Sequence, residues 1–285
     1  MPISKIKSDA LLTAASNPSS PSNGDMYYNT TDHEVRVYLN GEWRAQKPKP
    51  KDEYWDDVIC YVRGDGEHDL SRHKRRTQRV GCSTTSSSIG KPFTNGDIST
   101  FRRVGDSNAS DYLQVTAQTT GGGVGYMMDP SHNPAVTIEW WMYPTSTYSG
   151  YGHAIWLGGQ NGQGVIKFAG TDGKPYFYDS GGTVIDTTSY SGPSLMNSWH
   201  YYVFEFVYDA IAGTYQNSAY IDGTRINQTT TAPNTGVSTS NFLIGYSATA
   251  SEYGQFYFDE LRVTRAARYN GASSITVQTD PWPTE

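Results

Sequence analysis

The stretch VTIEWWMY at residues 136–143 alternates between two sets of side chains, and so does WHYYVFEFVY at residues 199–208. Because successive residues of a strand point to opposite sides of a sheet, each stretch predicts a strand with one core-facing side. The opposite sides still carry large aromatics, which predicts a covering layer: most commonly a loop, alternatively a ligand. The predicted core side chains are Val136, Ile138, Trp140, Met142, Tyr202, Phe204, Phe206 and Tyr208.

Strand patterns of this kind recur from residue 58 to residue 264, and turn pairs separate several of them. Asn-Gly stands at 95–96 and 161–162, and Asp-Gly at 172–173 and 222–223. These pairs are typical of tight turns between strands, and no stretch shows a convincing amphipathic-helix pattern. We therefore expect an all-β fold, a two-sheet antiparallel jelly-roll sandwich.

The composition agrees with many strands joined by polar turns, since the 285 residues include 29 Gly and 22 Tyr and only 18% are charged. The formal net charge of −6 argues against a nucleic-acid partner. No run approaches the roughly 20 apolar residues of a membrane span, and the N-terminus lacks the apolar core of a secretion signal. We therefore expect a protein made in a cytosol, without membrane insertion.

Residues 1–50 form a separate N-terminal segment by their pattern, and residues 51–285 the sandwich. MYYN at 26–29, EVRVYL at 34–39 and EWR at 42–44 predict a hairpin around the Asn40-Gly41 turn. KPKPK at 47–51 ends the ladder, because proline lacks an N–H donor. The hairpin is too small for a core of its own, so its apolar residues need a partner surface. The residues expected to serve assembly are Tyr28, Val35, Val37, Leu39 and Trp43.

Several motifs, in this order, resemble the laminin-G/concanavalin A-like modules of bacterial surface proteins and bacteriophage structural proteins. They are TIEWWMYP at 137–144, NSWHY at 197–201, YIDG at 220–223, LIG at 243–245, FDELRVTRAARY at 258–269 and DPWP at 280–283. The N-terminal stretches NGDMYYNTT at 23–31 and VRVYLNGEW at 35–43 are similar to segments of phage tail-fibre and virion appendage proteins.

The two resemblances together imply a bacteriophage virion structural protein, such as a tail fibre, appendage or capsid-associated fibre. It would be assembled in the host cytoplasm and exposed on the particle. Its N-terminal segment would bind other virion proteins, and its sandwich would bind host-surface polysaccharide. By resemblance we expect a homo-oligomer, specifically a homotrimer. The alternatives are a purely structural decoration, collar or tail subunit that uses the sandwich for protein packing, and a bacterial surface adhesin.

Catalysis is not expected, although glycoside hydrolases share this fold. Related hydrolases carry carboxylates in the order E-x-D-x-x-E on one strand face, and this chain has no such run. Asp259 and Glu260 are the nearest substitute, but adjacent strand residues point to opposite faces. Alternation places Asp259 on the side of Leu261 and Val263, as a partly buried carboxylate that accepts backbone or arginine hydrogen bonds.

Two groups of residues are candidates for ligand binding. The loop YSGYGH at 148–153 offers aromatics beside glycines, as a sugar site needs, with packing onto its own sandwich as the alternative. The glycan candidates are Tyr148, Tyr151, His153 and Trp141. A basic cluster beside His68 and His73 departs from the acidic average and is suited to an anionic partner, or is a solvated loop. Its members are Arg72, Lys74, Arg75, Arg76 and Arg79.

No cofactor is certain, and calcium is the open alternative. Asp65 and Asp106 stand in turn-like sequences rich in oxygen ligands, which hard cations prefer. Cys60 lies within the apolar stretch VICYV at 58–62, which predicts a reduced, buried thiol. A disulfide between Cys60 and Cys82 is the alternative.

Overall fold

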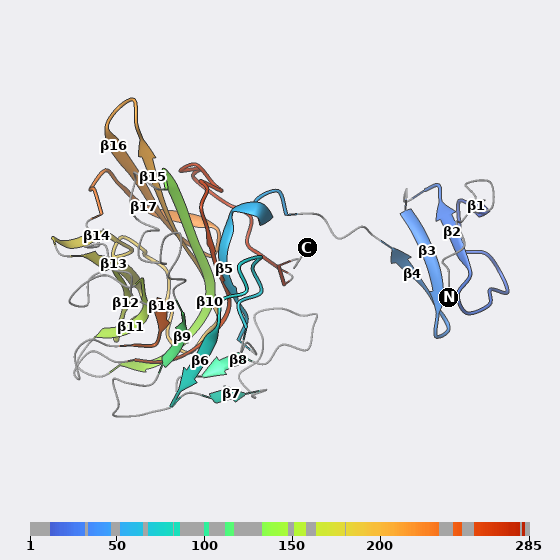
Figure 1. Cartoon of the computed structure of the whole chain (residues 1–285), viewed down its shortest axis with the longest axis horizontal. Coiled ribbons are helices and arrows are strands. Elements are labelled where there is room, and N and C mark those ends of the chain that lie inside the picture. Colours follow the sequence, from blue (N-terminus) through green and yellow to red (C-terminus); the bar gives the residue numbers. More distant parts are fainter. Residues whose placement is uncertain are drawn as a thin grey trace. The chain divides into compact units, whose positions relative to one another are not determined.

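The structure is a computed structural model, and it divides into a small unit, Met1–Asp52, and a large unit, Glu53–Thr284 (Figure 1). It describes residues 12–31, 34–46, 52–64, 68–81, 83–85, 100–102, 112–116, 133–147, 151–157, 164–179, 181–233, 242–246, 254–279 and 281–282. Among the residues described, no helix is long and apolar enough to cross a membrane.

The small unit is a sheet in which β2 (Met26–Asn29), β3 (Glu34–Leu39) and β4 (Glu42–Gln46) form the predicted antiparallel meander. Asn40 and Gly41 have φ angles of 52° and 89°, the left-handed values that a two-residue hairpin turn requires. A further strand, β1 (Leu12–Ala14), pairs in parallel with β2 and was not expected. The N-terminal hairpin is therefore confirmed and extended by one strand.

The large unit contains two sheets. The β10 sheet has the described order β17 (Thr224–Thr229), β16 (Thr214–Ile221), β15 (His200–Asp209), β10 (Ala135–Thr147), β19 (Gly254–Thr264), β8 (Thr100–Arg102) and β7 (Ser83–Thr85). Strand β5 (Val58–Val62), preceded by the short 3-10 helix η2 (Trp55–Asp57), also pairs with β19. The β11 sheet has the order β14 (Gly182–Asp186), β13 (Pro175–Asp179), β12 (Val165–Ala169), β11 (Tyr151–Trp156), β18 (Phe242–Ile244), β9 (Tyr112–Val115) and β6 (Thr77–Val80).

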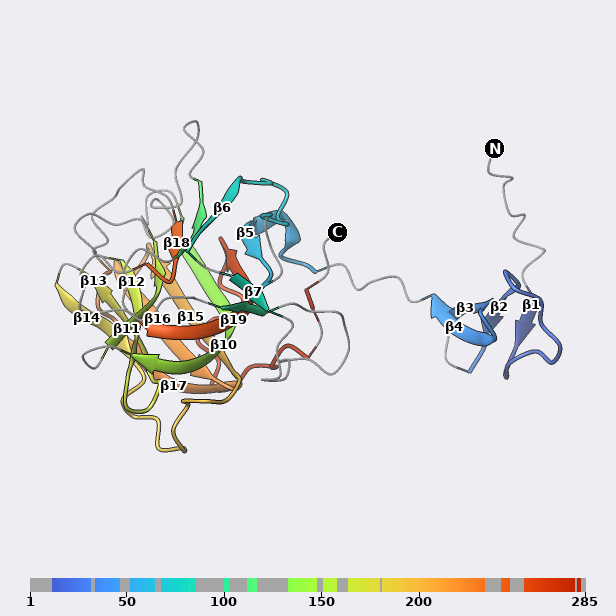
Figure 2. The same cartoon turned by 90° about the horizontal axis from the view of Figure 1, so that it is seen from below.

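The pairs within these two sheets are antiparallel, and the all-β sandwich predicted from alternation is confirmed. Figure 2 shows β19 beside β10, the pair at the centre of the β10 sheet. Strands β10 and β15 are in register, so that Ile138 pairs with Phe204 and Trp140 with Tyr202. Paired residues point to the same side, which brings both predicted apolar faces together.

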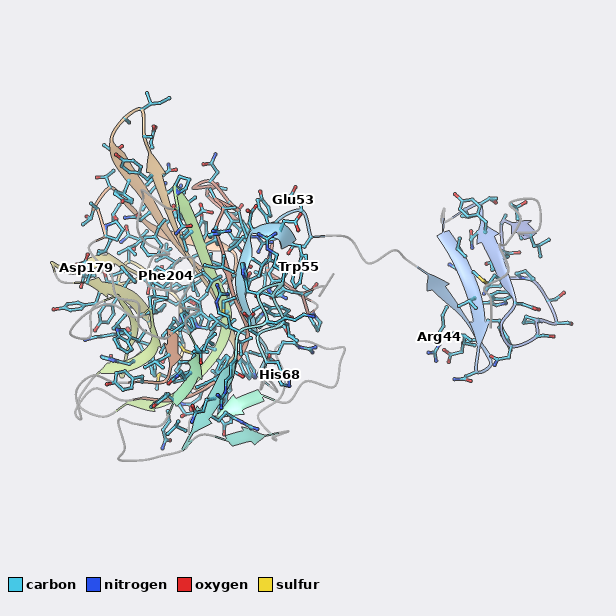
Figure 3. The ribbon with its side chains drawn as sticks, in the orientation of Figure 1. Arg44, Glu53, Trp55, His68, Asp179 and Phe204 are labelled. Carbon is cyan, nitrogen blue, oxygen red and sulfur yellow. The ribbon has the colours of Figure 1, made fainter. Side chains whose placement is uncertain are left out.

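The core between the sheets contains these paired residues, and Figure 3 labels Phe204 among them. The Trp140 ring stacks on Tyr202 and Phe204, with centroid distances of 5.5 and 5.9 Å. All the predicted core residues join this cluster except Tyr208, which is half-buried at the end of β15 and packs against Tyr215. The hydrophobic face of each long strand is therefore buried as alternation predicted.

Part of the outer face of the β10 sheet, turned away from the β11 sheet, is covered by the C-terminal segment, residues 265–279 and 281–282. There Trp141, Tyr201, Val203 and Tyr220 form a second apolar cluster. Tyr269, Ile275 and Val277 of the C-terminal segment pack against it. The prediction that a covering loop explains the outward aromatics is confirmed for Trp141 and Tyr201.

Candidate functional site

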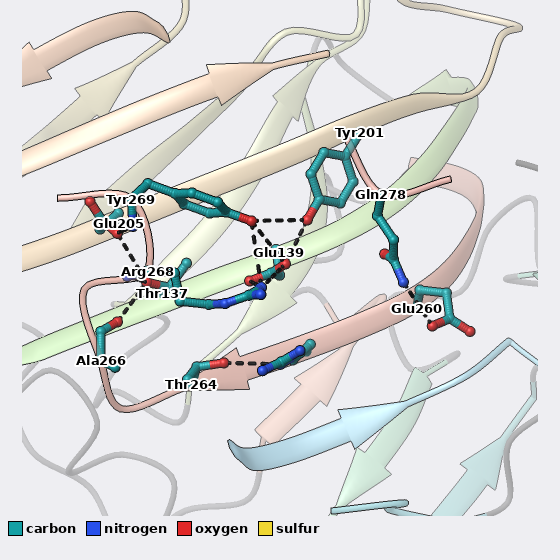
Figure 4. Close-up of polar contacts among 11 residues, drawn as sticks. Thr137, Glu139, Tyr201, Glu205, Glu260, Thr264, Ala266, Arg268, Tyr269 and Gln278 are labelled. Carbon is teal, nitrogen blue, oxygen red and sulfur yellow. Dashed lines mark hydrogen bonds and ion pairs between the residues drawn. The ribbon is translucent and has the colours of Figure 1, made fainter. Parts of the chain in front are cut away.

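A buried polar network lies beneath the C-terminal segment (Figure 4). Glu139 on β10 has no exposed surface, and its carboxylate accepts hydrogen bonds from the Arg268 guanidinium and the Tyr201 hydroxyl. The Tyr269 hydroxyl donates to Glu139 Oε1 at 3.3 Å. Burial, followed by the neighbouring Glu139 charge, raises the pKa of Tyr201 well above its usual value. Every oxygen of Glu139 is thus occupied by the protein itself.

Glu205 on β15 anchors the turn at the start of the same segment. Its two carboxylate oxygens accept the backbone N–H groups of Tyr269 at 2.8 Å and Gly271 at 3.0 Å. The Thr137 hydroxyl donates to the Ala266 carbonyl at 2.7 Å. These contacts tie the C-terminal segment to β10 and β15 through its backbone (Figure 4).

A second carboxylate pair, Asp259 and Glu260, lies on β19 at a bulge. The register with β10 shifts between Glu139, which pairs with Arg262, and Trp141, which pairs with Asp259. Glu260 takes the left-handed φ of 51°. The bulge resets the alternation, so Asp259 shares the outer face with Trp141 while Leu261 joins the core. The expectation that Asp259 lies on the side of Leu261 and Val263 is therefore wrong.

The two carboxylates of the bulge are held by donors from distant parts of the chain. Glu260 Oε2 accepts the Tyr61 hydroxyl at 2.6 Å and the Trp282 N–H at 2.9 Å, and Arg63 forms an ion pair with Oε1 at 3.1 Å. Asp259 Oδ1 accepts the Gly64 N–H at 2.8 Å, which confirms the expected backbone bonding. Burial, followed by the Glu260 charge, raises the pKa of Asp259 to about 8.

The closing motif FDELRVTRAARY therefore stabilises the fold, because its side chains bind distant parts of the chain. Arg262 is fully buried, and its guanidinium lies 4.5 Å from the centre of the Trp282 ring. Arg268 lies 4.4 Å from the same ring, so the tail that contains Trp282 covers both arginines. Because the carboxylates and cations of this layer are enclosed by the protein, the layer does not offer a surface to a ligand.

Of the expected glycan residues, the structure describes the side chains of Trp141 and His153, and these two lie on different sheets. Trp141 lies under the C-terminal segment on the β10 sheet, with 8% of its surface exposed and its ring against Tyr201. His153 belongs to β11 of the other sheet, is 2% exposed, and its Nδ1 lies 3.1 Å from the Tyr246 carbonyl oxygen. Trp141 is therefore removed from the proposed sugar site. Tyr148 and the Tyr151 side chain lie outside the described residues.

The basic cluster separates into three parts. Arg75 is 9% exposed and its guanidinium faces Asp69 at 3.5 Å, so it stabilises the turn internally and is not available to an anionic partner. Arg72 is exposed and lies 3.8 Å from Asp56, and Lys74 is exposed. Only Arg76 and Arg79 converge.

Arg76 and Arg79 line a pocket of about 510 Å³ together with His68 and Thr77, where β6 forms the edge of its sheet (His68 is labelled in Figure 3). Arg76 and His68 are exposed, and the two are joined by a backbone bridge. Among the described residues, the buried Thr77 hydroxyl has no hydrogen-bond partner. Within the described chain, this basic pocket brings together two of the residues that the sequence predicts to bind a ligand, Arg76 and Arg79.

A second hollow was not predicted. It is an open groove of about 830 Å³ on the outer face of β15, β16 and β17, lined by Thr214, Gln216, Gln228 and Asn270 among others. Polar residues are common on strands near the edge of a sheet, so no pattern in the sequence marks these lining residues as a binding site. Their convergence depends on β-strand register and on the turn at Asn270.

The remaining candidates are only partly described. Asp65, Asp106 and Cys82 lie outside the described residues. Within the described chain, no group of three or more His, Cys, Asp or Glu side chains is placed to hold a metal ion. Cys60 is fully buried, as expected, and burial raises the pKa of its thiol well above the usual value.

The five expected assembly residues lie on two faces of the small unit. Tyr28, Val35, Val37 and Leu39 share one face by strand pairing, but Trp43 lies on the other. There its ring contacts Tyr27 at a centroid distance of 4.8 Å, and its Nε1 donates to the Pro18 carbonyl at 3.4 Å. Trp43 thus makes its contacts inside the small unit.

Comparison with known proteins places this architecture in a family. The family model of the concanavalin A-like lectin/glucanases superfamily, Laminin_G_3, matches residues 106–270, more than half of the chain. No curated protein matches the sequence. Among solved structures, the binding domain of Paraclostridial Mosquitocidal Protein 1 is similar with a TM-score of 0.51 and 15% identity, over 75% of this chain and 50% of that one.

Domain 4 of AbnA, a GH43 extracellular arabinanase from Geobacillus stearothermophilus in complex with arabinotriose, has a TM-score of 0.49 and 13% identity. That match covers 73% of this chain and 92% of the domain. The chain spans about half the length of the mosquitocidal binding domain that it matches. At 15% identity, the similarity to the mosquitocidal binding domain shows a shared fold alone. The family model, in contrast, matches the sequence itself. The chain belongs to the concanavalin A-like lectin/glucanases superfamily.

Proposed function

We propose that this protein is a bacteriophage virion structural component whose sandwich binds host-surface glycans, as part of a tail fibre, appendage or capsid-associated fibre. The observation that carries the binding proposal is the basic pocket formed by His68, Arg76, Thr77 and Arg79. Guanidinium groups bind carboxylate, phosphate and sulfate through paired hydrogen bonds. An acidic host polysaccharide has the complementary chemistry.

The net charge of the whole chain indicates that a polyanion is attracted to the basic pocket and not to the surface in general. The net charge is −6, so a polyanion is repelled by most of the surface and attracted only where cations gather. The fold itself is compatible with binding, since the Paraclostridial protein uses it as a binding domain. Because proteins with one fold can have many functions, glycan binding is inferred from the basic pocket and not from the fold.

Binding of acidic and neutral bacterial polysaccharides to the full chain tests this proposal. Arg76→Ala combined with Arg79→Ala should weaken binding to an acidic polysaccharide by about tenfold or more, because two charge-assisted contacts are lost. Arg72→Ala combined with Lys74→Ala is the matched control, since it removes the same charge outside the pocket. Each variant should lose less than about 1 kcal/mol of stability in thermal unfolding, as expected for exposed charges. Equal binding by the two double variants contradicts the proposal.

The virion location and the homotrimer need separate measurements. Mass spectrometry and antibody labelling of purified phage particles should detect the chain on their surface. Light scattering of the full chain should give three copies. Absence from particles overturns the phage assignment without affecting glycan binding.

A second candidate function is a purely structural virion subunit, favoured by one feature of the small unit. Tyr28, Val35, Val37 and Leu39 share one face of its sheet with Met26, which is 38% exposed; Val37 is buried, and Tyr28, Val35 and Leu39 are half-buried. We propose that this face binds other virion proteins. Deletion of residues 1–50 should leave a folded sandwich that no longer assembles, and assembly by the truncated chain contradicts this function.

A further inference from the structure

The open groove on the outer face of β15, β16 and β17 has a chemistry different from that of the basic pocket. Strand pairing puts Val207 opposite Gln216 and Asp209 opposite Thr214. Paired residues share a face, so these four side chains line the groove floor together. Tyr208 and Tyr215 form the alternate pair, and their side chains point to the other side of the sheet.

The two glutamines of the groove are positioned by the C-terminal segment. Gln228 Nε2 lies 3.4 Å from the Ser218 hydroxyl. Gly271 packs so closely on both side chains that a Cβ there would lie 2.8 Å from Gln228 Nε2 and 3.0 Å from Gln216 Oε1. Gly271 is itself fixed, because its N–H donates to Glu205 and its carbonyl accepts from Arg225. Contact with Gly271 therefore restricts both side chains before any ligand arrives, which lowers the entropic cost of binding.

Asp209 closes one end of the groove with a carboxylate that is only partly used. Its Oδ1 accepts the N–H groups of Ile211 at 2.8 Å and Ala212 at 3.0 Å, which orients the side chain at the hairpin turn. Asp209 is exposed and lines the groove. A carboxylate oxygen accepts hydrogen bonds and donates none when it is ionised. This end of the groove suits hydroxyl donors.

The described lining contains amides, hydroxyls, one carboxylate, the apolar side chain of Val207 and part of Tyr215, but no Lys or Arg. Amides both donate and accept hydrogen bonds, and the carboxylate accepts. An anion would be repelled by Asp209, whereas a neutral molecule with neighbouring hydroxyls matches these groups and can lay its C–H face on Val207. We infer that this groove is a binding subsite for a neutral oligosaccharide, separate from the basic pocket.

This inference rests on the proposed function, since it adds a neutral subsite to a glycan-binding sandwich. The two sites nevertheless respond to different variables. Binding of a neutral ligand through hydrogen bonds should be nearly independent of salt, whereas binding of a polyanion to Arg76 and Arg79 should weaken as salt screens the charges. Salt dependence therefore distinguishes the groove from the basic pocket.

The test uses the full chain and three neutral probes: maltohexaose, cellohexaose and chitohexaose. Gln216→Ala combined with Gln228→Ala should weaken binding of the bound probe by about tenfold in calorimetry, since two hydrogen-bonding amides are lost. Gln78→Ala is the control, because Gln78 is an equally exposed amide that lines neither hollow. Both glutamines of the groove are exposed, so folding should be unaffected.

A second variant, Asp209→Asn, keeps the side chain's shape and the acceptor for the turn. It should weaken neutral-sugar binding and leave acidic-polysaccharide binding unchanged. The inference is overturned if none of the three probes binds the full chain, or if the double glutamine variant binds as tightly as the parent. In either case the acidic polysaccharide remains the separate readout: its binding preserves the proposed function, and its absence overturns that as well.

Discussion

The outer face of the β10 sheet carries two polar regions, one covered by the C-terminal segment and one open to solvent. In the covered region, Glu139 and Glu260 accept hydrogen bonds from hydroxyl, amide and guanidinium groups of the chain itself. In the groove beside β16, Gln216, Gln228 and Asp209 are exposed. Charged groups are costly to bury unless they are paired, whereas exposed ones are available for exchange with a ligand. The difference separates residues that hold the fold from residues that can bind.

The largest effect is expected from breaking the buried ion pair between Arg268 and Glu139. Arg268→Met should destabilise the large unit by about 3–5 kcal/mol, because it leaves a buried carboxylate without its cation. Urea unfolding followed by tryptophan fluorescence measures this loss. The double variant with Glu139→Gln should recover part of the stability. A loss below about 1 kcal/mol would place this pair among ordinary surface ion pairs.

The next effect is a pH dependence that originates at Asp259. Its pKa is raised to about 8 in the folded protein, so the folded state binds a proton that the unfolded state releases near pH 4. Stability from this group is complete below pH 4 and is lost as the pH rises through about 8, by up to about 1.4 kcal/mol per pH unit.

Asp259→Asn should flatten this decline, which urea unfolding at pH 5 and pH 8 would measure. The decline should not vanish, because burial also raises the pKa of Glu260 and acts in the same direction. An unchanged slope in the variant would assign the pH dependence to other groups.

A smaller loss is expected from Tyr61→Phe, which removes one donor to Glu260. The Tyr61 hydroxyl lies 2.6 Å from Glu260 Oε2 in a buried setting. Loss of a hydrogen bond to a charged group costs about 1.5–3 kcal/mol. Tyr28→Phe in the small unit is a useful control, and it should leave the unfolding of the large unit unchanged. Glu260 Oε2 also accepts the Trp282 N–H at 2.9 Å and the Gln278 side-chain amide at 3.3 Å, and equal unfolding of Tyr61→Phe and the parent would show that these two donors suffice.

The smallest effect is expected at the exposed pair of Arg72 and Asp56. These groups are 3.8 Å apart, and about half of the Arg72 side chain is exposed. Solvent screens such pairs, so Arg72→Ala should cost less than about 1 kcal/mol in the same urea assay. A loss of unfolding free energy close to that of Arg268→Met would contradict the distinction between covered and open charges. The assignment of sites depends on that distinction.

Particular residues show where sequence reasoning succeeded for the site and where it failed. Arg76 and Arg79 of the predicted basic cluster line one pocket, but Arg75, the residue just before Arg76, turns inward to Asp69, since neighbouring residues of the chain face different directions. Trp141 was assigned to a sugar site because it is aromatic and points away from the core. Its actual neighbour is the C-terminal segment, which lies far away in the sequence. Alternation along a strand predicts which side chains point away from the core, but not which segment covers them.

The sequence alone determined the strand pattern, the Asn40-Gly41 hairpin and the faces that form the core, because alternation and turn preference are local properties of the backbone. It also indicated that a layer covers the outward aromatics. Only the tertiary structure decided which layer this is, since Glu139, Glu205 and Glu260 bind donors that lie 18 to 199 residues away. The bulge at Glu260 and the convergence of Gln216 and Gln228 against Gly271 likewise depend on strand register, a relation between distant segments that no short stretch of sequence contains.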